Sequence, residues 1–174
     1  MPSLAGLYRP SVMLPAPSPY ETMRRMAQAV HQGQLDPELR ALTERLVQNV
    51  FPHDYLSEYA AILNWTRMNI RYLRDPRTIE QIKTPRAVVE TGNGDCDDMT
   101  VLVATLAGGI GARVRFVAGA FQRHPSGTPA LSHVWAEVYD PASRAWAILD
   151  PVPGRNVASM VKRLIHAVAM PVVD

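Results

Sequence analysis

The chain has 174 residues, of which 47% are hydrophobic and 20% are charged, and its formal net charge is +2. This length is sufficient for one domain with a substantial core, and the composition is typical of a globular protein. The small net charge gives no argument for nucleic acid or a membrane as a partner. The single cysteine, Cys96, excludes an internal disulfide framework and a multi-cysteine zinc site.

The first nineteen residues contain five of the fifteen prolines and predict an extended arm. They lack the charged leader and uninterrupted apolar block of a signal peptide, and no later stretch has the roughly 18 apolar residues of a membrane span. We therefore expect a cytoplasmic or phage virion-associated protein. Residues 1–19 would be a tail, or an arm that binds a protein partner, and residues 20–174 would form a single domain.

Three helices are predicted in the first half of the chain. The first spans residues 20–32, with apolar side chains at helical spacing, and should stop at Gly33. The second runs over about 37–49, and Asp36 can cap its start. The third begins after Asp54, which is a second candidate cap, and ends before the next proline.

The prolines and glycines of residues 76–94 predict a loop. A fourth helix follows, which begins at Asp95 or Cys96 and carries an apolar stripe as far as "GGIG" at 108–111. Asp95 and Asp98 stand three residues apart, a spacing that suits a capping box in the first helical turn.

After this helix the periodicity becomes alternating, which predicts strands over residues 112–121, 132–140 and 144–150. A last helix is predicted over residues 156–168. The middle strand places one set of side chains on one face, namely Val134, Ala136 and Val138, and a second set on the other face, namely His133, Trp135, Glu137 and Tyr139. Helices, then strands, then a helix indicate an α+β domain with a mainly antiparallel sheet.

The last two strands can bring a histidine and an aspartate together. If the turn between them is residues 140–143, Tyr139 pairs with Arg144 and His133 lies directly across from Asp150. Directly opposed residues have Cβ atoms about 4.5 to 5.5 Å apart. A carboxylate at that distance can accept a hydrogen bond from the imidazole and orient it, as in a set of nucleophile, base and orienting group.

Cys96 is the candidate nucleophile, because a helix N-terminus stabilises a thiolate. Its backbone N–H could also help to hold an oxyanion. The neighbouring aspartates oppose activation, since adjacent carboxylates raise the pKa of a thiol. A positively charged His133 would be needed to offset them. Taken singly, Cys96 could instead be a small core residue, and the aspartates only caps and solvated charges.

Four blocks of sequence occur in a diagnostic order: "NIRYLRDP" at 69–76, "TPRAVVETGNGDCDDMTVLVATLAGGIGARVRFV" at 84–117, "SHVWAEVYD" at 132–140 and "AWAILDP" at 145–151. A cysteine at a helix start, a histidine opening a strand and an aspartate ending the next strand resemble the transglutaminase-like superfamily of papain-fold cysteine enzymes. The resemblance covers about residues 55–152. It implies helices and a cysteine-bearing helix packed on an antiparallel sheet.

The resemblance implies that Cys96 is the nucleophile, His133 the general acid–base and Asp150 the orienting group of an acyl-transfer enzyme. It favours a peptidase or amidase, acting on a peptide, protein or peptidoglycan-like amide, over a cross-linking transglutaminase. No cofactor is required, although calcium at Asp95, Asp97 and Asp98 is an alternative to capping. The strand side chains Trp135, Glu137 and Tyr139 are candidates for a substrate cleft. The alternative function is a structural or assembly module, for example in a phage virion.

Overall fold

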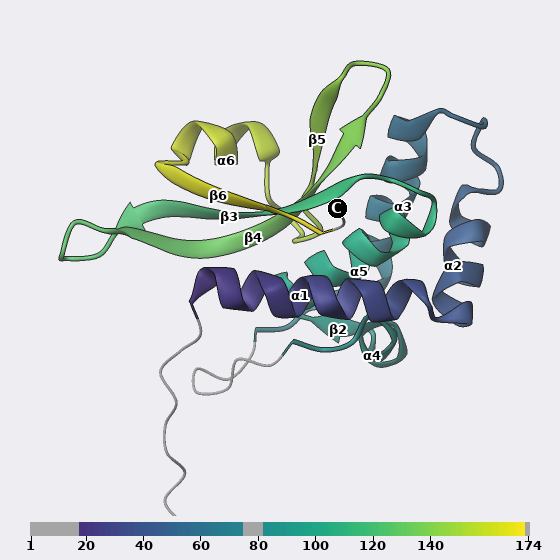
Figure 1. Cartoon of the computed structure of the whole chain (residues 1–174), viewed down its shortest axis with the longest axis horizontal. Helices are drawn as coiled ribbons and strands as arrows, with labels where there is room; N and C mark the ends of the chain where they lie inside the picture. Colours follow the sequence, from purple (N-terminus) through teal and green to yellow (C-terminus); the bar gives the residue numbers. More distant parts are fainter. Residues whose placement is uncertain (1–17, 75–81, 173–174) are drawn as a thin grey trace, which may run out of the picture.

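A computed structural model describes residues 18–74 and 82–172 of the chain (Figure 1). Residues 1–17 of the predicted arm lie outside the described residues. Ser18 belongs to the domain, because its side chain accepts a hydrogen bond from Glu21 and caps the first helix, α1 (Pro19–Gln34). Among the described residues, every helix is too short or too polar to cross a lipid bilayer.

The first three helices form where the sequence predicts them, and their caps explain why. Asp36 caps α2 (Pro37–Val47) and Asp54 caps α3 (Tyr55–Asn69), each by accepting backbone N–H groups of the first turn. The predicted stop at Gly33 is wrong. The helix continues through Gly33, which is buried where α1 meets later elements, so this glycine provides space rather than a helix end.

The predicted loop over residues 76–94 contains structure at its end. Residues 75–81 lie outside the described residues, but α4 (Pro85–Thr91) follows them, capped by Thr84 and ended by Gly92 in the left-handed conformation. Two short strands, β1 (Arg71–Tyr72) and β2 (Asn93–Gly94), pair in parallel beside it. A threonine before Pro85 and a glycine seven residues later are helix start and stop signals. The prediction of a loop over these residues is therefore wrong for 85–91.

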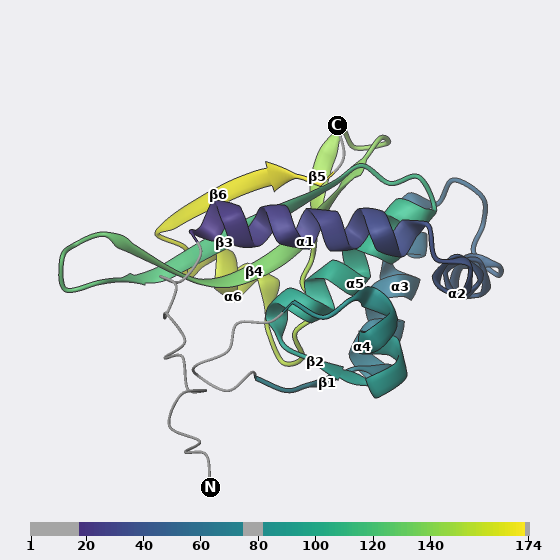
Figure 2. The ribbon, with the colours of Figure 1, turned by 60° about the horizontal axis from the view of Figure 1, so that its bottom comes forward.

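The fourth predicted helix is α5 (Cys96–Gly109), and it runs through the middle of the domain (Figure 2). Its start has the predicted capping box, in which Asp95 accepts from the first-turn N–H groups and Asp98 accepts from the N–H of Asp95. Every residue from 98 to 107 is buried, so this helix has no solvent-facing side. Such a central element holds its first residue, Cys96, in a fixed position.

A four-stranded antiparallel sheet forms the second layer, in the order β5-β4-β3-β6. Its strands are β3 (Val114–Arg123), β4 (Pro129–Asp140), β5 (Ala145–Leu149) and β6 (His166–Pro171). One face of β4 packs with α5 in the main core, through Val134, Ala136 and Val138. The opposite face carries Trp135, which packs with Val117 and with Met160 of α6 (Val157–Arg163). The α+β fold with a mainly antiparallel sheet is therefore confirmed.

The final helix predicted over residues 156–168 is only half correct. Helix α6 ends at Arg163, the backbone of Leu164 is extended, and the next residues form β6 along the open edge of β3. The stretch "HAVAMP" alternates small and larger apolar residues, which also fits a strand. Pairing with β3 satisfies backbone groups that a longer helix would leave on the sheet edge.

Candidate active site

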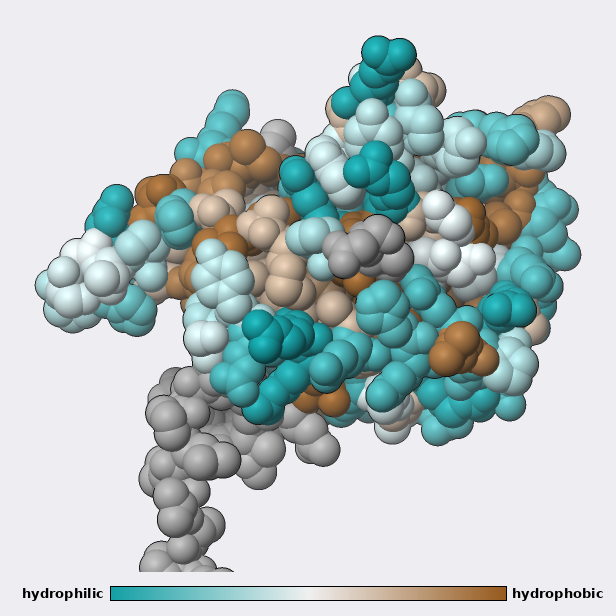
Figure 3. Space-filling model, viewed as in Figure 1, coloured by the Kyte–Doolittle hydropathy of each residue, from teal (hydrophilic) through white to brown (hydrophobic). Residues whose placement is uncertain are grey.

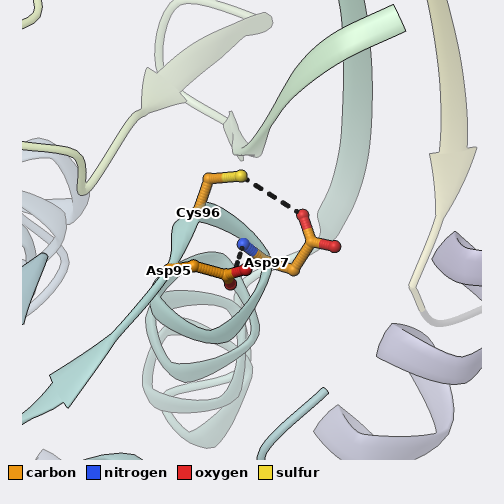
Figure 4. A group of neighbouring side chains, drawn as sticks. All are labelled: Asp95, Cys96 and Asp97. Carbon is orange, nitrogen blue, oxygen red and sulfur yellow. Dashed lines mark hydrogen bonds between the residues drawn. The ribbon is translucent and has the colours of Figure 1, made fainter. Parts of the chain in front are cut away.

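The site begins at the N-terminus of α5, where Cys96 is half-buried between two aspartates (Figure 4). The Cys96 thiol donates a hydrogen bond to Oδ1 of Asp97 at 3.4 Å. Asp95 uses its carboxylate to cap the helix, accepting from the N–H groups of Asp97 and Asp98. The thiol is therefore bound by Asp97, while the carboxylate of Asp95 is occupied by the helix start.

The start of α5 is fixed against β4 at a single residue, Val134. The β4–β5 ladder begins only at Ala136, so the edge of β4 before that point is open to the helix. The backbone N–H of Val134 faces the Cys96 sulfur and favours its thiolate form. The hydroxyl of Thr100, one helical turn after the cysteine, donates to the carbonyl of Val134 at 3.2 Å. Both backbone groups of this residue thus face α5.

The residue before Val134 is His133, and it is hydrogen-bonded to Asp150 as predicted from sequence. Nε2 of His133 lies 2.8 Å from Oδ2 of Asp150, and both side chains are buried, with 1% and 0% of their surface exposed. A buried carboxylate bonded to an imidazole fixes the orientation of the ring. Because Nε2 is engaged, a proton exchanged with another group would pass through Nδ1.

The strand register that led to this pair is nevertheless wrong by two residues. Tyr139 pairs with Trp146 instead of Arg144, because Arg144 adopts a left-handed conformation and belongs to the turn. Asp140 closes this turn by accepting from Ala142 and Ser143. A shift of two residues leaves each side chain on its predicted face.

Asp150 is held by groups that the sequence did not identify. Its Oδ1 accepts from the N–H of Val152 at 3.0 Å, and its carbonyl accepts from Nη2 of Arg67 at 2.6 Å. Arg67 belongs to α3 and lies 83 residues earlier, so no local pattern could have indicated this contact. Thr100, in contrast, follows Cys96 at helical spacing and could have been proposed from the sequence.

Burial and the neighbouring carboxylates raise the pKa of the Cys96 thiol well above its ordinary value. Loss of hydration is the largest cause, followed by the charges of Asp97 and Asp95 and the hydrogen bond to Asp97. The N–H of Val134 acts in the opposite direction, but more weakly. In this arrangement the cysteine is a neutral thiol at neutral pH, and a base has to remove its proton when it reacts.

The three aspartates around Cys96 have different surroundings. Asp98 is fully buried and binds the backbone N–H of Lys83 at 2.7 Å and its ammonium group at 3.4 Å. Asp95, Cys96 and Asp97 bring ligand atoms within 4.8 Å of one another. Calcium takes six to eight oxygen ligands, and this group offers two carboxylates and a sulfur. Calcium therefore stays a prediction.

The three side chains predicted to line a substrate cleft make contacts within the domain. Trp135 is buried and donates to Glu137 at 3.2 Å, and Glu137 binds Arg115 at 2.7 Å. Tyr139 is half-buried and meets Trp146 edge-on, with ring centroids 5.6 Å apart. A contact of any of them with a substrate stays a prediction.

A family model described as the transglutaminase-like superfamily matches residues 40–151. A "putative protease" from Parabacteroides distasonis is 9% identical, with a TM-score of 0.57, over 84% of this chain and 32% of its own length. A "putative cysteine protease" from Cytophaga hutchinsonii is 16% identical, with a TM-score of 0.59, over 93% of this chain and 54% of its own length. The chain thus spans about a third to a half of these two proteins, and no curated protein matches it.

Proposed function

The chain belongs to the transglutaminase-like superfamily, and on this premise we propose that it is a cysteine peptidase or amidase. Cys96 would be its nucleophile, His133 its general acid–base and Asp150 its orienting group. The superfamily supports a cysteine-dependent enzyme in general terms. The buried bond of 2.8 Å between His133 and Asp150 carries the more specific proposal, because His133 directly precedes Val134, whose backbone N–H favours the thiolate of Cys96.

The proposed reaction proceeds through a thioester. As the sulfur of Cys96 attacks the carbonyl carbon of an amide, its proton passes to Nδ1 of His133, and the carbonyl oxygen gains negative charge. The C–N bond then breaks and His133 returns the proton to the leaving amine. Water, deprotonated by the same imidazole, hydrolyses the thioester to a carboxylic acid and the free thiol. Asp150 keeps the ring in position and stabilises the imidazolium that forms in each half.

The backbone N–H of Cys96 is one donor for the oxyanion in this proposal. It occupies the first position of α5, where an N–H has no partner within the helix, and it lies on the reacting residue itself. Since the pKa of the thiol is raised, the reaction would start from a neutral thiol and imidazole instead of an ion pair. Proton transfer to His133 and attack on the carbonyl would then occur together.

The proposal is tested by mapping reactivity and turnover on the same residues. A cysteine-directed activity-based probe should add its mass at Cys96, and amide hydrolysis in a screen of peptides and peptidoglycan fragments should vanish in Cys96→Ala. His133→Gln should lower turnover at least 100-fold. The matched control is His124→Gln, an exposed histidine at the tip of the β3–β4 hairpin, which should leave turnover unchanged. Unaltered turnover in both Cys96→Ala and His133→Gln would overturn the proposal.

A second candidate function, a structural or assembly module without activity, is favoured by one observation. Burial and two carboxylates raise the pKa of the thiol, which disfavours its reactive form. An intact fold that takes up no probe at Cys96 at any pH from 6 to 9 would support this alternative. Hydrolysis and cross-linking are distinguished by adding a primary amine, because a transglutaminase would incorporate it into the acyl product whereas a peptidase would release mainly acid.

A further inference from the structure

The outer edge of the sheet is formed by β6, which has β3 as its only neighbour among the described strands. Past the end of this strand, the N–H of Val172 donates to the carbonyl of Val114 at 3.0 Å. In an antiparallel ladder, hydrogen-bonded pairs alternate with non-bonded pairs. Counting from Val172 toward the start of β6, every second residue therefore also bonds to β3. The residues between them, Ala167 and Ala169, direct both N–H and C=O groups to the open edge. Pro171 directs only a carbonyl there.

The side chains around this edge leave it accessible. Ala167, Ala169 and Pro171 are exposed and small, so no bulky group covers the strand. Apolar neighbours continue the surface, since Ile165 is 45% exposed and Val161 of α6 is 48% exposed. Figure 3 shows hydrophobic colours over β6 and α6, bounded by hydrophilic colours over α1. A strand edge of this kind is a template for another extended chain.

The charge around the edge is of one sign. In the stretch 112–172 the acidic residues are Glu137, Asp140 and Asp150, and all three are buried. The exposed ionisable residues near the edge, on the β3–β4 hairpin, just before α6, on α6 and on β6, are basic: Arg123, His124, Arg155, Lys162, Arg163 and His166. Within the described stretch 112–172, a partner that lies along this edge therefore meets exposed basic side chains and no exposed carboxylate.

We propose that the outer edge of β6 binds an extended, acidic segment of another protein by strand addition. Backbone groups of the segment would bond to those of Ala167 and Ala169, its apolar side chains would lie against Val161 and Ile165, and its carboxylates would meet the basic residues. A second copy of the chain fits less well, since residues 161–172 contain no acidic side chain, so an isologous β6–β6 pair would bring no carboxylate to the basic residues. The surface uses none of Cys96, His133 and Asp150, so it is independent of the proposed function.

The test uses the full chain and a fluorescent ten-residue peptide that alternates threonine or valine with glutamate. Fluorescence anisotropy should show saturable binding that weakens at least fivefold between 50 and 300 mM salt. The double variant Lys162→Glu/Arg163→Glu should bind at least tenfold more weakly. Arg45→Glu, an exposed arginine on α2, is the matched control and should change binding less than twofold.

Two further arms separate strand addition from simple charge attraction. Ala169→Pro removes an outward N–H and no bond to β3, so it should fold and yet lose at least tenfold in affinity. In the unaltered chain, the peptide should slow hydrogen exchange at the amides of Ala167 and Ala169. The proposal is overturned if a lysine-containing counterpart binds equally well. It is also overturned if a single-stranded oligonucleotide of equal charge competes fully and the two amides gain no protection.

Discussion

The thiol of Cys96 is held in its protonated form chiefly by burial and by Asp97, which both accepts its hydrogen bond and adds a negative charge. Asp97→Asn removes that charge and should lower the pKa of the thiol. The thiolate fraction at pH 7 to 8 should therefore rise, and iodoacetamide should label Cys96 several times faster than in the unaltered chain. Rates of alkylation followed by mass spectrometry between pH 6 and 10 measure this shift directly.

Asp97→Glu is the control for this prediction, because it retains the charge and should leave the alkylation profile close to that of the unaltered chain. If Asp97→Asn alkylates no faster than either, Asp97 does not control the thiol, and its pKa is raised by burial and by Asp95.

Thr100 links the cysteine-bearing helix to the histidine-bearing strand through the carbonyl of Val134. Thr100→Val keeps the shape of the side chain but leaves that buried carbonyl unsatisfied, which should cost about 1 to 3 kcal/mol of unfolding free energy. Turnover on an amide substrate should fall while KM changes little, since the contact positions Cys96 and does not touch substrate. Thr100→Ser keeps the hydroxyl and should restore most of the turnover. Equal turnover in both variants would assign Thr100 a role in stability alone.

At the residue scale, the sequence predicted the pairing of His133 with Asp150 although the assumed register was wrong. The alternation of β4 fixed the face of His133, and a two-residue shift preserves that face, so the error did not separate the pair. Arg67 was beyond prediction, because its contact depends on where α3 packs against the end of β5. Contacts between residues far apart in the chain, such as that of Arg67 with Asp150, were therefore the ones that the sequence could not predict.

Among the elements, α1 packs tightly against both α4 and α5 at Gly33. A Cβ atom added there would lie 2.8 Å from Cγ of Pro85 and 2.8 Å from Cγ2 of Thr105. Gly33→Ala should therefore destabilise the fold by about 1 to 2 kcal/mol, because overpacking outweighs the better helix propensity of alanine. Urea unfolding monitored by circular dichroism provides the measurement.

Gly109→Ala is the matched control for this helix contact. It lies at the end of α5, where an added Cβ would meet Oγ1 of Thr43 at an ordinary 3.4 Å. This variant should be as stable as the unaltered chain, or slightly more stable. A loss equal to that of Gly33→Ala would mean that the close approach of α1 is not what requires a glycine.

Element prediction succeeded where caps and periodicity agreed and was wrong where they conflicted. The starts of α2, α3 and α5 have aspartate caps before apolar stripes, and all three were predicted correctly. The C-terminal stretch has an apolar pattern that fits a helix up to Val168, yet the chain becomes extended at Leu164. The choice between helix and strand for these residues depends on the edge of β3, which is free to pair with them. That edge is a tertiary feature, so a short window of sequence does not contain it.

Across the whole molecule, surface charge is divided between the two layers. The exposed acids near the sheet are few because those of residues 112–172 are buried, whereas the helices carry exposed acids such as Glu21, Glu38 and Glu44. This division was not apparent from the net charge of +2, which averages the two layers. A charge balance close to zero therefore does not exclude a locally basic surface, and an overall count is a weak guide to partners.

Two aspartates connect elements of the whole domain and should control its stability in acid. Asp36 caps α2 and binds Arg86 of α4, which holds its pKa below the ordinary value. Asp140 closes the β4–β5 turn, where its hydrogen bonds with Ser143 lower its pKa. Because these groups are more acidic in the folded state, the unfolded chain takes up protons first as the pH falls. Their stabilisation is present above about pH 4 and is lost as the pH falls further.

Asp36→Asn isolates the charge, because asparagine is as good a helix cap as aspartate. The variant should be less stable than the unaltered chain at pH 7, and its urea midpoint should fall less steeply between pH 6 and pH 3. Asp140→Asn should flatten the same part of the profile. Since the two sites share no partner, the double variant should show the sum of both changes. If the pH profiles of the variants stay parallel to that of the unaltered chain, other carboxylates determine acid unfolding. The ion pair between Asp36 of the α2 cap and Arg86 of α4 would then contribute no pH-dependent stability.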